Sequence, residues 1–481
     1  SVSAVTAFEV MKYDYEDLYA AKKTYGQDIN TSLGNAADPI DADQKLQEDA
    51  LMSYVASVNY SYDDKYYASF SFRRDGSSRL SPDTRWGNFW SLSASWRLSQ
   101  ERFMQPLKSV LSDLKLRASY GVNGNLPSSY YGYQSTYTTG AFYSGKPSPW
   151  ESTLGNEELT WEKNYALNLG LDIGLFSRVN VSLDWYTRTT KDLLMSKQLN
   201  SISGFSSLLT NVGQMRNTGV ELEVRSNNIK TKDFSWTTAF NLSHNKNKIL
   251  KLADLPWFVD GRYVRKEGYP FNTIYLREYA GVDPETGSAL YYDNQQDENG
   301  NYTKNKVTDP GQASPIPLKD ITPTISGGFM NTFNYKFIDL SFNLSYSFGG
   351  YSYDNASYIL QDDGYSVISN KSTEQRRRWQ KPGDITDVPR FVYGNKKGGN
   401  YNSSRAIHST DHIRLKSLIL GLNAPKAWLQ KLGIGNARIY FSGTNLLTWA
   451  AYDQYDPEMS GVVGFYTPPL KTYAFGLELK F

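Results

Sequence analysis

The chain of 481 residues contains no cysteine. This absence excludes disulfide bonds, thiolate metal sites and cysteine nucleophiles from the chain, and it leaves the cellular compartment open. An excess of charge of one sign is also missing, because 51 basic residues are matched by 49 acidic ones. A balance of this kind gives no electrostatic footprint for nucleic acid, so we expect no nucleic-acid partner.

Long hydrophobic runs are absent as well. No run approaches the roughly 18 apolar residues of a membrane helix, and the mean hydropathy is −0.54. This low average does not exclude a membrane barrel, because alternation averages a lipid-facing residue with a lumen-facing one. Residues 1–10 show no charged stretch followed by an apolar one, so no signal peptide is recognised. We expect that it has been removed or that the chain is part of a precursor.

Candidates for chemistry are few. The only histidines are His244, His408 and His412, and none stands in a metal-ligand or triad arrangement. Asp293–Gly300 resembles a calcium loop, but its sixth position is not glycine and Lys304 stands where the bidentate glutamate belongs. A solvated turn is the simpler interpretation. The sequence therefore predicts no metal site, no cofactor and no catalytic residue, and we expect a protein that is not an enzyme.

Aromatic residues, in contrast, are abundant and make up 15% of the chain. Many fall in segments of about ten residues in which apolar and polar side chains alternate, as in 164–175 and 337–348. Because successive side chains of a strand point to opposite faces, each segment predicts a strand with one apolar and one polar face. Fourteen strands are predicted in this way: 2–14, 51–62, 66–74, 86–98, 113–122, 162–175, 178–189, 217–227, 233–245, 323–336, 337–348, 411–423, 435–446 and 470–481.

The last predicted strand carries an apolar stripe that runs to a terminal aromatic residue. The stripe consists of Tyr473, Phe475, Leu477, Leu479 and Phe481. This form is typical of the closing strand of a bacterial outer-membrane barrel, whose ending the assembly machinery reads. An edge strand of a soluble sandwich would alternate equally well, so the stripe alone leaves both architectures open.

The connections between the predicted strands separate by length. Counted back from residue 481, every second connection is short: 63–65, 99–112, 176–177, 228–232, the junction near 336, and 424–434. The others are mostly long: 15–50, 75–85, 123–161, 190–216, 246–322, 349–410 and 447–469. A membrane barrel has short periplasmic turns and long outer loops, whereas a sandwich has no reason to sort its loops. Strand-like pieces within 246–322 are placed in a folded outer excursion, which leaves the count open by two strands.

Polar residues on the inner faces of these strands are expected to line a lumen or to contact whatever fills it. They are Asp172, Asp184, Glu221, Arg225 and Asp339. Glu221 and Glu223 resemble a paired carboxylate site, but Arg225 follows on the same side. A charge-balanced wall is therefore the simpler interpretation.

The predicted outer loops are rich in aromatic residues, which can stack on sugars, pack against peptides or simply stabilise the loops. The candidates for substrate contact are Trp150, Trp257, Tyr263, Trp379, Tyr393 and Tyr401. The basic and proline-punctuated segment 376–391 is either a loop that faces a lid or a well-anchored long loop.

Several passages together resemble the C-terminal barrel of SusC/RagA-type TonB-dependent transporters. They are 60–78 (YSYDDKYYASFSFRRDGSS), 211–223 (NVGQMRNTGVELE), 322–335 (TPTISGGFMNTFNY), 379–391 (WQKPGDITDVPRF), 413–421 (IRLKSLILG), 440–447 (YFSGTNLL) and the terminal strand. The resemblance implies a barrel of about 22 strands with an N-terminal plug, a TonB box and a SusD-type surface lipoprotein. It also implies import of oligosaccharides or peptides, driven by proton-motive force that TonB relays.

The chain departs from this pattern because it lacks the plug, the TonB box, the small N-terminal domain and about eight strands. We therefore expect an all-β fold in which residues 1–481 form the C-terminal part of a transmembrane antiparallel barrel in the bacterial outer membrane. Its expected partners are the missing N-terminal barrel and plug segment, TonB, a SusD-type lipoprotein, membrane lipid and the imported ligand. The alternatives are a complete 14-stranded passive porin and a secreted all-β protein that binds or hydrolyses carbohydrate.

Overall fold

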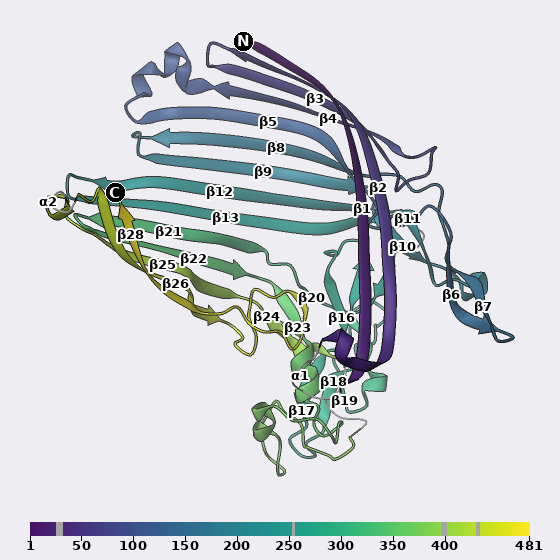
Figure 1. The fold of residues 1–481 in the computed structure, drawn as a ribbon. Coiled ribbons are helices and arrows are strands. Elements are labelled where there is room, and N and C mark those ends of the chain that lie inside the picture. The colour runs from purple at the N-terminus through teal and green to yellow at the C-terminus, as the bar shows by residue number, and fades with distance from the viewer. Residues whose placement is uncertain (26–31, 253–254, 396–401, 430–432) are drawn as a thin grey trace. The chain divides into compact units, whose positions relative to one another are not determined.

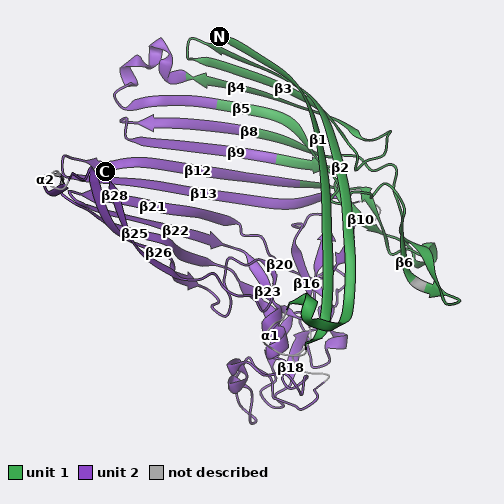
Figure 2. Ribbon diagram, viewed as in Figure 1, with its two compact units in different colours: residues 1–97, 117–168, 188–215 green, residues 98–116, 169–187, 216–481 purple. Residues whose placement is uncertain are grey.

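The computed structural model describes residues 1–25, 32–252, 255–395, 402–429 and 433–481, and in these ranges the chain is built mainly from strands (Figure 1). None of the helices in the described ranges is long and apolar enough to cross a membrane. The all-β expectation is therefore confirmed. Two compact units are distinguished in Figure 2: residues 1–97, 117–168 and 188–215 form unit 1, and residues 98–116, 169–187 and 216–481 form unit 2.

The main sheet has fourteen strands, which follow one another in chain order, and all fourteen strands predicted from the sequence are confirmed. They are β1 (Val2–Tyr25), β2 (Ala36–Tyr62), β3 (Tyr66–Ser77), β4 (Trp86–Arg97), β5 (Leu111–Asn125), β8 (Glu162–Leu175), β9 (Val179–Lys191), β12 (Gln214–Lys230), β13 (Phe234–Lys251), β21 (Ile325–Tyr335), β22 (Ile338–Phe348), β25 (His412–Asn423), β26 (Asn436–Ala450) and β28 (Thr472–Lys480). β1 and β28 end the order, and no strand in the described ranges pairs with their outer edges.

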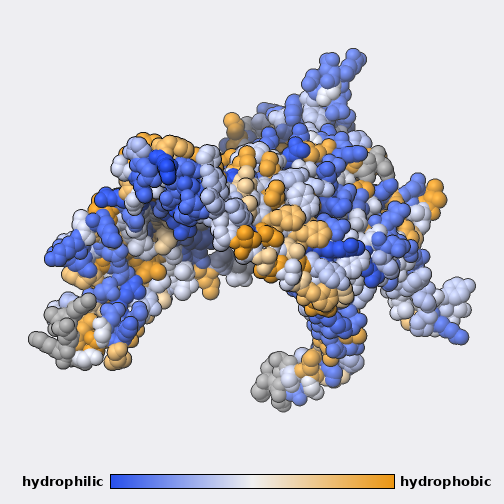
Figure 3. Space-filling view, turned by 90° about the horizontal axis from the view of Figure 1, so that it is seen from above, coloured by the Kyte–Doolittle hydropathy of each residue, from blue (hydrophilic) through white to orange (hydrophobic). Residues whose placement is uncertain are grey.

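The first four strands, all in unit 1, show how the sequence divides the sheet into two faces. Val58, Phe70 and Leu92 lie opposite one another on β2, β3 and β4, so they share one face. All three are exposed by 44% or more. Ser69 and Ser93 pair on the other face, which is polar and hollowed into a cavity of about 590 Å³. Apolar side chains exposed in rows are those that lipid covers in a membrane. Figure 3 shows hydrophobic patches among hydrophilic residues on the face in view.

Strands of unit 2 show the same division, with glycines that leave room for aromatic rings. Gly327 on β21 lies directly opposite Tyr346 on β22. A Cβ atom at Gly327 would stand 2.1 Å from the backbone oxygen of Asn241 and 2.4 Å from the Tyr346 hydroxyl oxygen. That hydroxyl donates a hydrogen bond of 2.7 Å to the Asn241 oxygen. The Tyr346 ring thus lies over Gly327 and reaches β13, the strand beyond β21. An aromatic ring placed over a glycine in this way stabilises strand pairing.

One predicted loop is wrong. Residues 15–50 were expected to form an outer loop, but β1 and β2 continue their antiparallel pairing as a hairpin up to Tyr25 and Ala36. On the apolar face, the pair Val10 and Met52 is followed by Lys12 opposite Ala50, and Lys12 pairs with Asp14 at 2.8 Å. Beyond this point charged residues are mixed with apolar ones such as Leu18 and Leu46, so the alternation that marks a strand is missing. At about 3.3 Å per residue, the extension is roughly 45 Å long.

The connections sort by length as predicted, apart from this hairpin. The end of the sheet that carries the short turns is called the short-turn end, and the opposite end the long-loop end. In the parts of the short connections that the structure describes, short helical pieces occur, such as η2 (Leu98–Gln100), η3 (Arg102–Leu107) and α2 (Lys426–Leu429).

The long connections fold into small sheets outside the main one, so the expected folded excursion in 246–322 is confirmed. The small sheets are β6 (Thr136–Tyr143) with β7 (Lys146–Thr153); β10 (Leu194–Gln198) with β11 (Ser207–Asn211); β14 (Trp257–Asp260), β15 (Tyr263–Lys266), β16 (Thr273–Leu276) and β20 (Ile316–Asp320); β17 (Tyr279–Val282), β18 (Ala289–Tyr292) and β19 (Lys306–Val307); and β23 (Tyr351–Asp354), β24 (Ile407–Ser409) and β27 (Gly461–Val463). The helix α1 (Asn355–Leu360) follows β23 directly.

Each unit has a hydrophobic core at its long loops. In unit 1, Phe89 and Trp161 pack edge to face with ring centroids 5.1 Å apart, together with the fully buried Leu80 and Leu159. In unit 2, the buried Ile274, Leu276, Tyr353 and Ala406 join β16 to the sheet of β23 and β24. Because these cores include residues of the long connections, such as Leu80, Leu159 and Tyr353, the connections are packed structures.

Candidate functional site

A cavity of about 620 Å³ lies at the long-loop end of β25 and β26, within unit 2. It is called the mouth cavity here, and α1, the ends of the two strands and the segment 451–471 supply its walls. Its lining residues include Arg414, Thr448, Asp453, Tyr455, Asp456 and Tyr466. The volume falls within the roughly 300–1,000 Å³ of small-molecule sites in proteins.

Strand register places this cavity on the polar face of the sheet. Arg414 on β25 lies opposite Ser345 on β22 and Thr448 on β26. Ser345 belongs to the polar row of β22, because it lies two positions after Asn343 and directly after the apolar Leu344. Since side chains opposite one another share a face, Arg414 and Thr448 point to the polar side.

Arg414 fastens the segment 451–471 to this face. Its guanidinium donates to Asp456 at 2.7 Å, to Glu458 at 2.9 Å and to the Thr448 hydroxyl at 3.1 Å. Lys416 contacts the same Glu458 carboxylate at 2.5 Å. Arg414 is buried, with 2% of its surface exposed. A buried guanidinium needs carboxylate partners, so the two acidic residues fix the loop in place.

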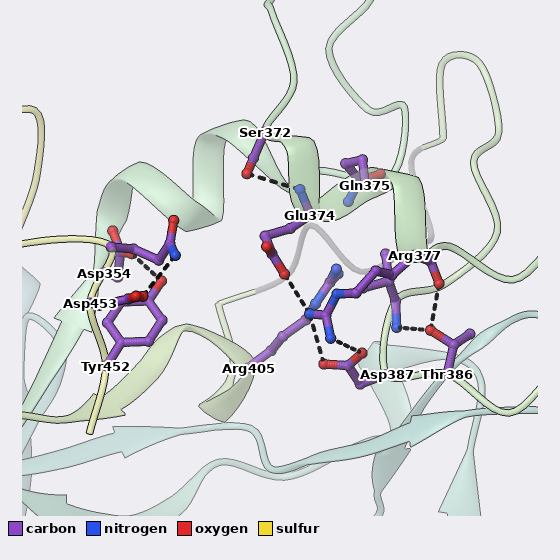
Figure 4. Close-up of polar contacts among 12 residues, drawn as sticks. Asp354, Ser372, Glu374, Gln375, Arg377, Thr386, Asp387, Arg405, Tyr452 and Asp453 are labelled. Atoms are coloured by element: carbon purple, nitrogen blue, oxygen red, sulfur yellow. Dashed lines mark hydrogen bonds and ion pairs between the residues drawn. The ribbon is translucent and has the colours of Figure 1, made fainter. Parts of the chain in front are cut away.

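A second set of contacts holds α1 beside the cavity (Figure 4). The Tyr452 hydroxyl donates to Asp354 at 2.9 Å, and the same carboxylate accepts the Ser357 backbone N–H at the start of α1. The ring of His408 stacks on Tyr452 with centroids 3.7 Å apart and planes 3° apart. Burial raises the pKa of Tyr452 and lowers the pKa of His408, so it favours the neutral form of each ring.

The long connection 349–411 is anchored by buried ion pairs. Arg405 contacts Asp363, whose side chain is fully buried, and Gln375 donates to the same carboxylate at 2.9 Å. Figure 4 also shows Arg377 between Glu374 and Asp387. These contacts favour a well-anchored loop for 376–391.

The described aromatic residues that were predicted to contact substrate are not among those that line the mouth cavity. Trp379 donates from its indole nitrogen to the Pro284 oxygen at 2.8 Å, and Tyr263 packs against the core around Ile274. Trp257 packs against Tyr275 with ring centroids 5.9 Å apart. The other described candidates are exposed: Trp150 on β7 by 53% and Tyr393 by 78%.

None of these five residues lines the mouth cavity as the structure describes it, and Tyr401 lies outside the described residues. The cavity instead brings together Tyr455, Phe465 and Tyr466 from one predicted loop, 447–469. The sequence signal for them was the density of aromatic, acidic and proline residues in 452–469 (YDQYDPEMSGVVGFYTPP), which sequence analysis did not single out.

The residues predicted to face a lumen belong to polar contacts between strands. Asp339 on β22 forms an ion pair of 2.5 Å with Arg438 on β26. Gly421 on the intervening strand leaves room for this pair, because a Cβ there would meet both side chains. Ser182 on β9 donates to Asp172 on β8 at 2.7 Å and contacts Asp184 at 3.5 Å.

Arg225 pairs with Glu223 on its own strand, β12. Glu221 lies two residues before Glu223, so the three charged side chains share one face of the strand, as the sequence indicated.

The predicted assembly signature lies on β28 and at the residue after it. Phe475 is opposite Phe441 and Leu477 is opposite Ile439, so the stripe continues an apolar row of β26. Its members are all exposed: Tyr473 61%, Phe475 82%, Leu477 63%, Leu479 43% and Phe481 88%. Exposed apolar side chains on a terminal strand fit a surface that lipid covers.

Comparisons with known proteins agree with this architecture. The family described as "TonB dependent receptor-like, beta-barrel" matches residues 6–368. The TonB-dependent receptor P3 of Formosa agariphila is 31% identical over all of this chain and 50% of its own length. The TonB-dependent receptor SusC of Bacteroides thetaiotaomicron is 31% identical over 91% of this chain and 45% of its own length.

A solved structure of the RagAB peptide transporter superimposes with a TM-score of 0.89 and 30% identity, covering 100% of this chain and 53% of that one. The chain thus spans about half the length of the relatives it matches. The family match covers the predicted strands as far as 337–348, and the P3 receptor and the RagAB structure match over the whole chain. The chain belongs to the TonB-dependent receptor-like β-barrel family.

Proposed function

We propose that the chain forms part of the wall of a TonB-dependent importer that carries oligosaccharides or peptides across the bacterial outer membrane. The observation that carries this proposal is the division of the fourteen-stranded sheet into an apolar and a polar face. Such a sheet places its apolar face against lipid and its polar face toward a lumen. The family to which the chain belongs lies in the outer membrane.

The long-loop end would face the outside of the cell and the short-turn end the periplasm. The change from Val10 and Met52 to Lys12 on the apolar face of β1 and β2 would mark the outer boundary of the lipid. The mouth cavity would then lie near the outer opening of the lumen. Its role would be to bind the ligand before occlusion and release, without a bond being made or broken.

The rest of the importer is part of this proposal. Further strands would pair with the free edges of β1 and β28 to complete a barrel of about 22 strands. An N-terminal plug would fill the lumen, TonB would contact the region before the plug, and a SusD-type lipoprotein would close the outer opening. RagAB, which is similar in structure, is described as a peptide importer with "open-open" and "closed-closed" states. These states support an importer whose mouth opens and closes.

Uptake by intact cells tests the proposal. Cells that carry the gene should accumulate members of a radiolabelled pool of oligosaccharides and peptides. Deletion of the gene, deletion of TonB or collapse of the proton-motive force by a protonophore should each abolish the gene-dependent uptake. Uptake that continues without TonB would point to a passive porin. A chain that folds alone in water as a closed sandwich would point to a secreted protein.

A further inference from the structure

We propose that the mouth cavity binds an uncharged sugar unit of an imported oligosaccharide. The inference rests on the proposed import function and narrows its ligand from two classes to one. Three properties of the cavity carry it: its charge balance, its exposed aromatic faces and its exposed planar polar side chains.

The charges that line the cavity cancel. Arg414 and Lys471 carry positive charge, and Asp453 and Asp456 carry negative charge. The guanidinium of Arg414 is already engaged by Asp456 at 2.7 Å and by Glu458 at 2.9 Å. It therefore has no carboxylate-binding edge left for a uronate, a sulfate or a peptide carboxylate. A neutral ligand meets no uncompensated buried charge in this cavity.

Two aromatic residues of the lining present free ring surface. Phe465 is 68% exposed and Tyr466 is 62% exposed. Pro468 and Pro469 follow them in the lining, and proline fixes its own φ near −65°, which restricts this part of the loop. Tyr455 adds a third ring, whose hydroxyl is engaged with Ser352. Rigid aromatic faces suit the C–H-bearing face of a sugar ring and lose little conformational entropy on binding.

Side chains for hydroxyl recognition lie beside these rings. Asp453 and Gln454 are both exposed, and the Gln454 amide donates to one Asp453 oxygen at 2.9 Å. The pair offers a ligand two acceptors, the Gln454 amide oxygen and the second Asp453 carboxylate oxygen. It also offers the second N–H of the Gln454 amide as a donor. Asn445 is fixed by a 3.2 Å bond from its amide to the Leu470 oxygen. Adjacent sugar hydroxyls both donate and accept, so they match an aspartate beside a glutamine.

Binding by the complete transporter, purified in detergent with its partner subunit, tests this assignment. The probes are an array of neutral, uronate-containing and sulfated oligosaccharides and a tryptic casein digest. The variants are Tyr466→Ala, Tyr466→Phe and Asp453→Ala, with Tyr365→Ala as a matched control. Tyr365 is 51% exposed in the same unit and is not part of the cavity lining.

We expect the transporter to retain neutral oligosaccharides and to bind them at least about tenfold more weakly with Tyr466→Ala or Asp453→Ala. Tyr466→Phe, which keeps the ring, and Tyr365→Ala should bind almost as the unchanged protein does. The assignment is overturned if no neutral oligosaccharide is retained, if the variants leave its binding unchanged, or if Tyr466→Ala weakens the binding of peptides or charged sugars instead. TonB-dependent uptake of peptides alone would overturn this assignment and leave the import function standing.

Discussion

Arg414 on the strand β25 donates a hydrogen bond of 2.7 Å to Asp456, which lies 42 residues later in the segment 451–471. The guanidinium belongs to the polar face of the sheet and the carboxylate belongs to the loop. The bond therefore joins the wall to the loop that forms most of the mouth cavity. Because both side chains are nearly inaccessible to solvent, at 3% and 7% exposure, the loop position depends on this pair.

Asp456→Asn should loosen this loop. The substitution keeps the shape of the side chain but removes its charge, while Glu458 still contacts Arg414. Hydrogen bonds to charged groups contribute about 1.5–3 kcal/mol, so we expect a local loss of about 1–2 kcal/mol. Amide hydrogen exchange in 451–471 should then become roughly tenfold faster. Asp453→Asn, at an exposed position of the same segment, is the control. Equal exchange in both variants would show that the pair does not hold the loop.

Gly327 and Gly328 provide a matched pair on β21. A Cβ at Gly327 would overlap the Asn241 oxygen and the Tyr346 hydroxyl, whereas the nearest atom to a Cβ at Gly328 is 3.4 Å away. We expect Gly327→Ala to destabilise the protein by about 1–3 kcal/mol through overpacking, and Gly328→Ala to change little. Thermal unfolding in detergent, followed by tryptophan fluorescence, gives the comparison. A larger loss for Gly328→Ala would mean that Tyr346 does not cross the strand at Gly327.

His408 should make the packing of β23, β24 and β27 sensitive to pH. Burial lowers its pKa below the ordinary 6.5, although the Asp354 carboxylate opposes this shift. Its Nε2 is buried and has no hydrogen-bond partner among the described residues. The unfolded chain therefore binds a proton more readily than the folded one. The stabilising contribution is complete above about pH 6.5 and is lost as the pH falls through the lowered folded pKa.

Hydrogen exchange of this small sheet, measured from pH 7.5 down to pH 5 and corrected for the intrinsic rates, should show the loss. His408→Phe, which keeps a flat ring over Tyr452 but cannot be protonated, should remove the pH dependence. The explanation fails if the variant and the unchanged protein lose protection in parallel.

The alternation of apolar and polar residues was sufficient to locate all fourteen strands of the main sheet, because one face of each is apolar. It failed at the hairpin extension, where Tyr13 pairs with Asp49 and Asp14 pairs with Glu48. Charged and apolar residues are mixed there without a regular alternation, so strand and loop look alike in sequence. The mouth cavity could not be predicted either. The cavity depends on contacts between distant residues, such as that of Arg414 with Asp456. The alternation of residues within one segment does not reveal such contacts.

The absence of cysteine from the chain makes its central feature directly measurable, because single cysteines can be introduced at chosen sites where the chain has none of its own. Leu92 and Phe70 lie opposite one another on the apolar face, and Ser93 and Ser69 lie opposite one another on the polar face. The four variants are Leu92→Cys, Phe70→Cys, Ser93→Cys and Ser69→Cys. Each variant, labelled with a fluorophore and reconstituted in bilayers, is exposed to lipids that carry a quencher. The account predicts strong quenching at positions 70 and 92 and weak quenching at 69 and 93. Equal quenching on the two faces, or the reverse order, would contradict a sheet whose apolar face meets the membrane.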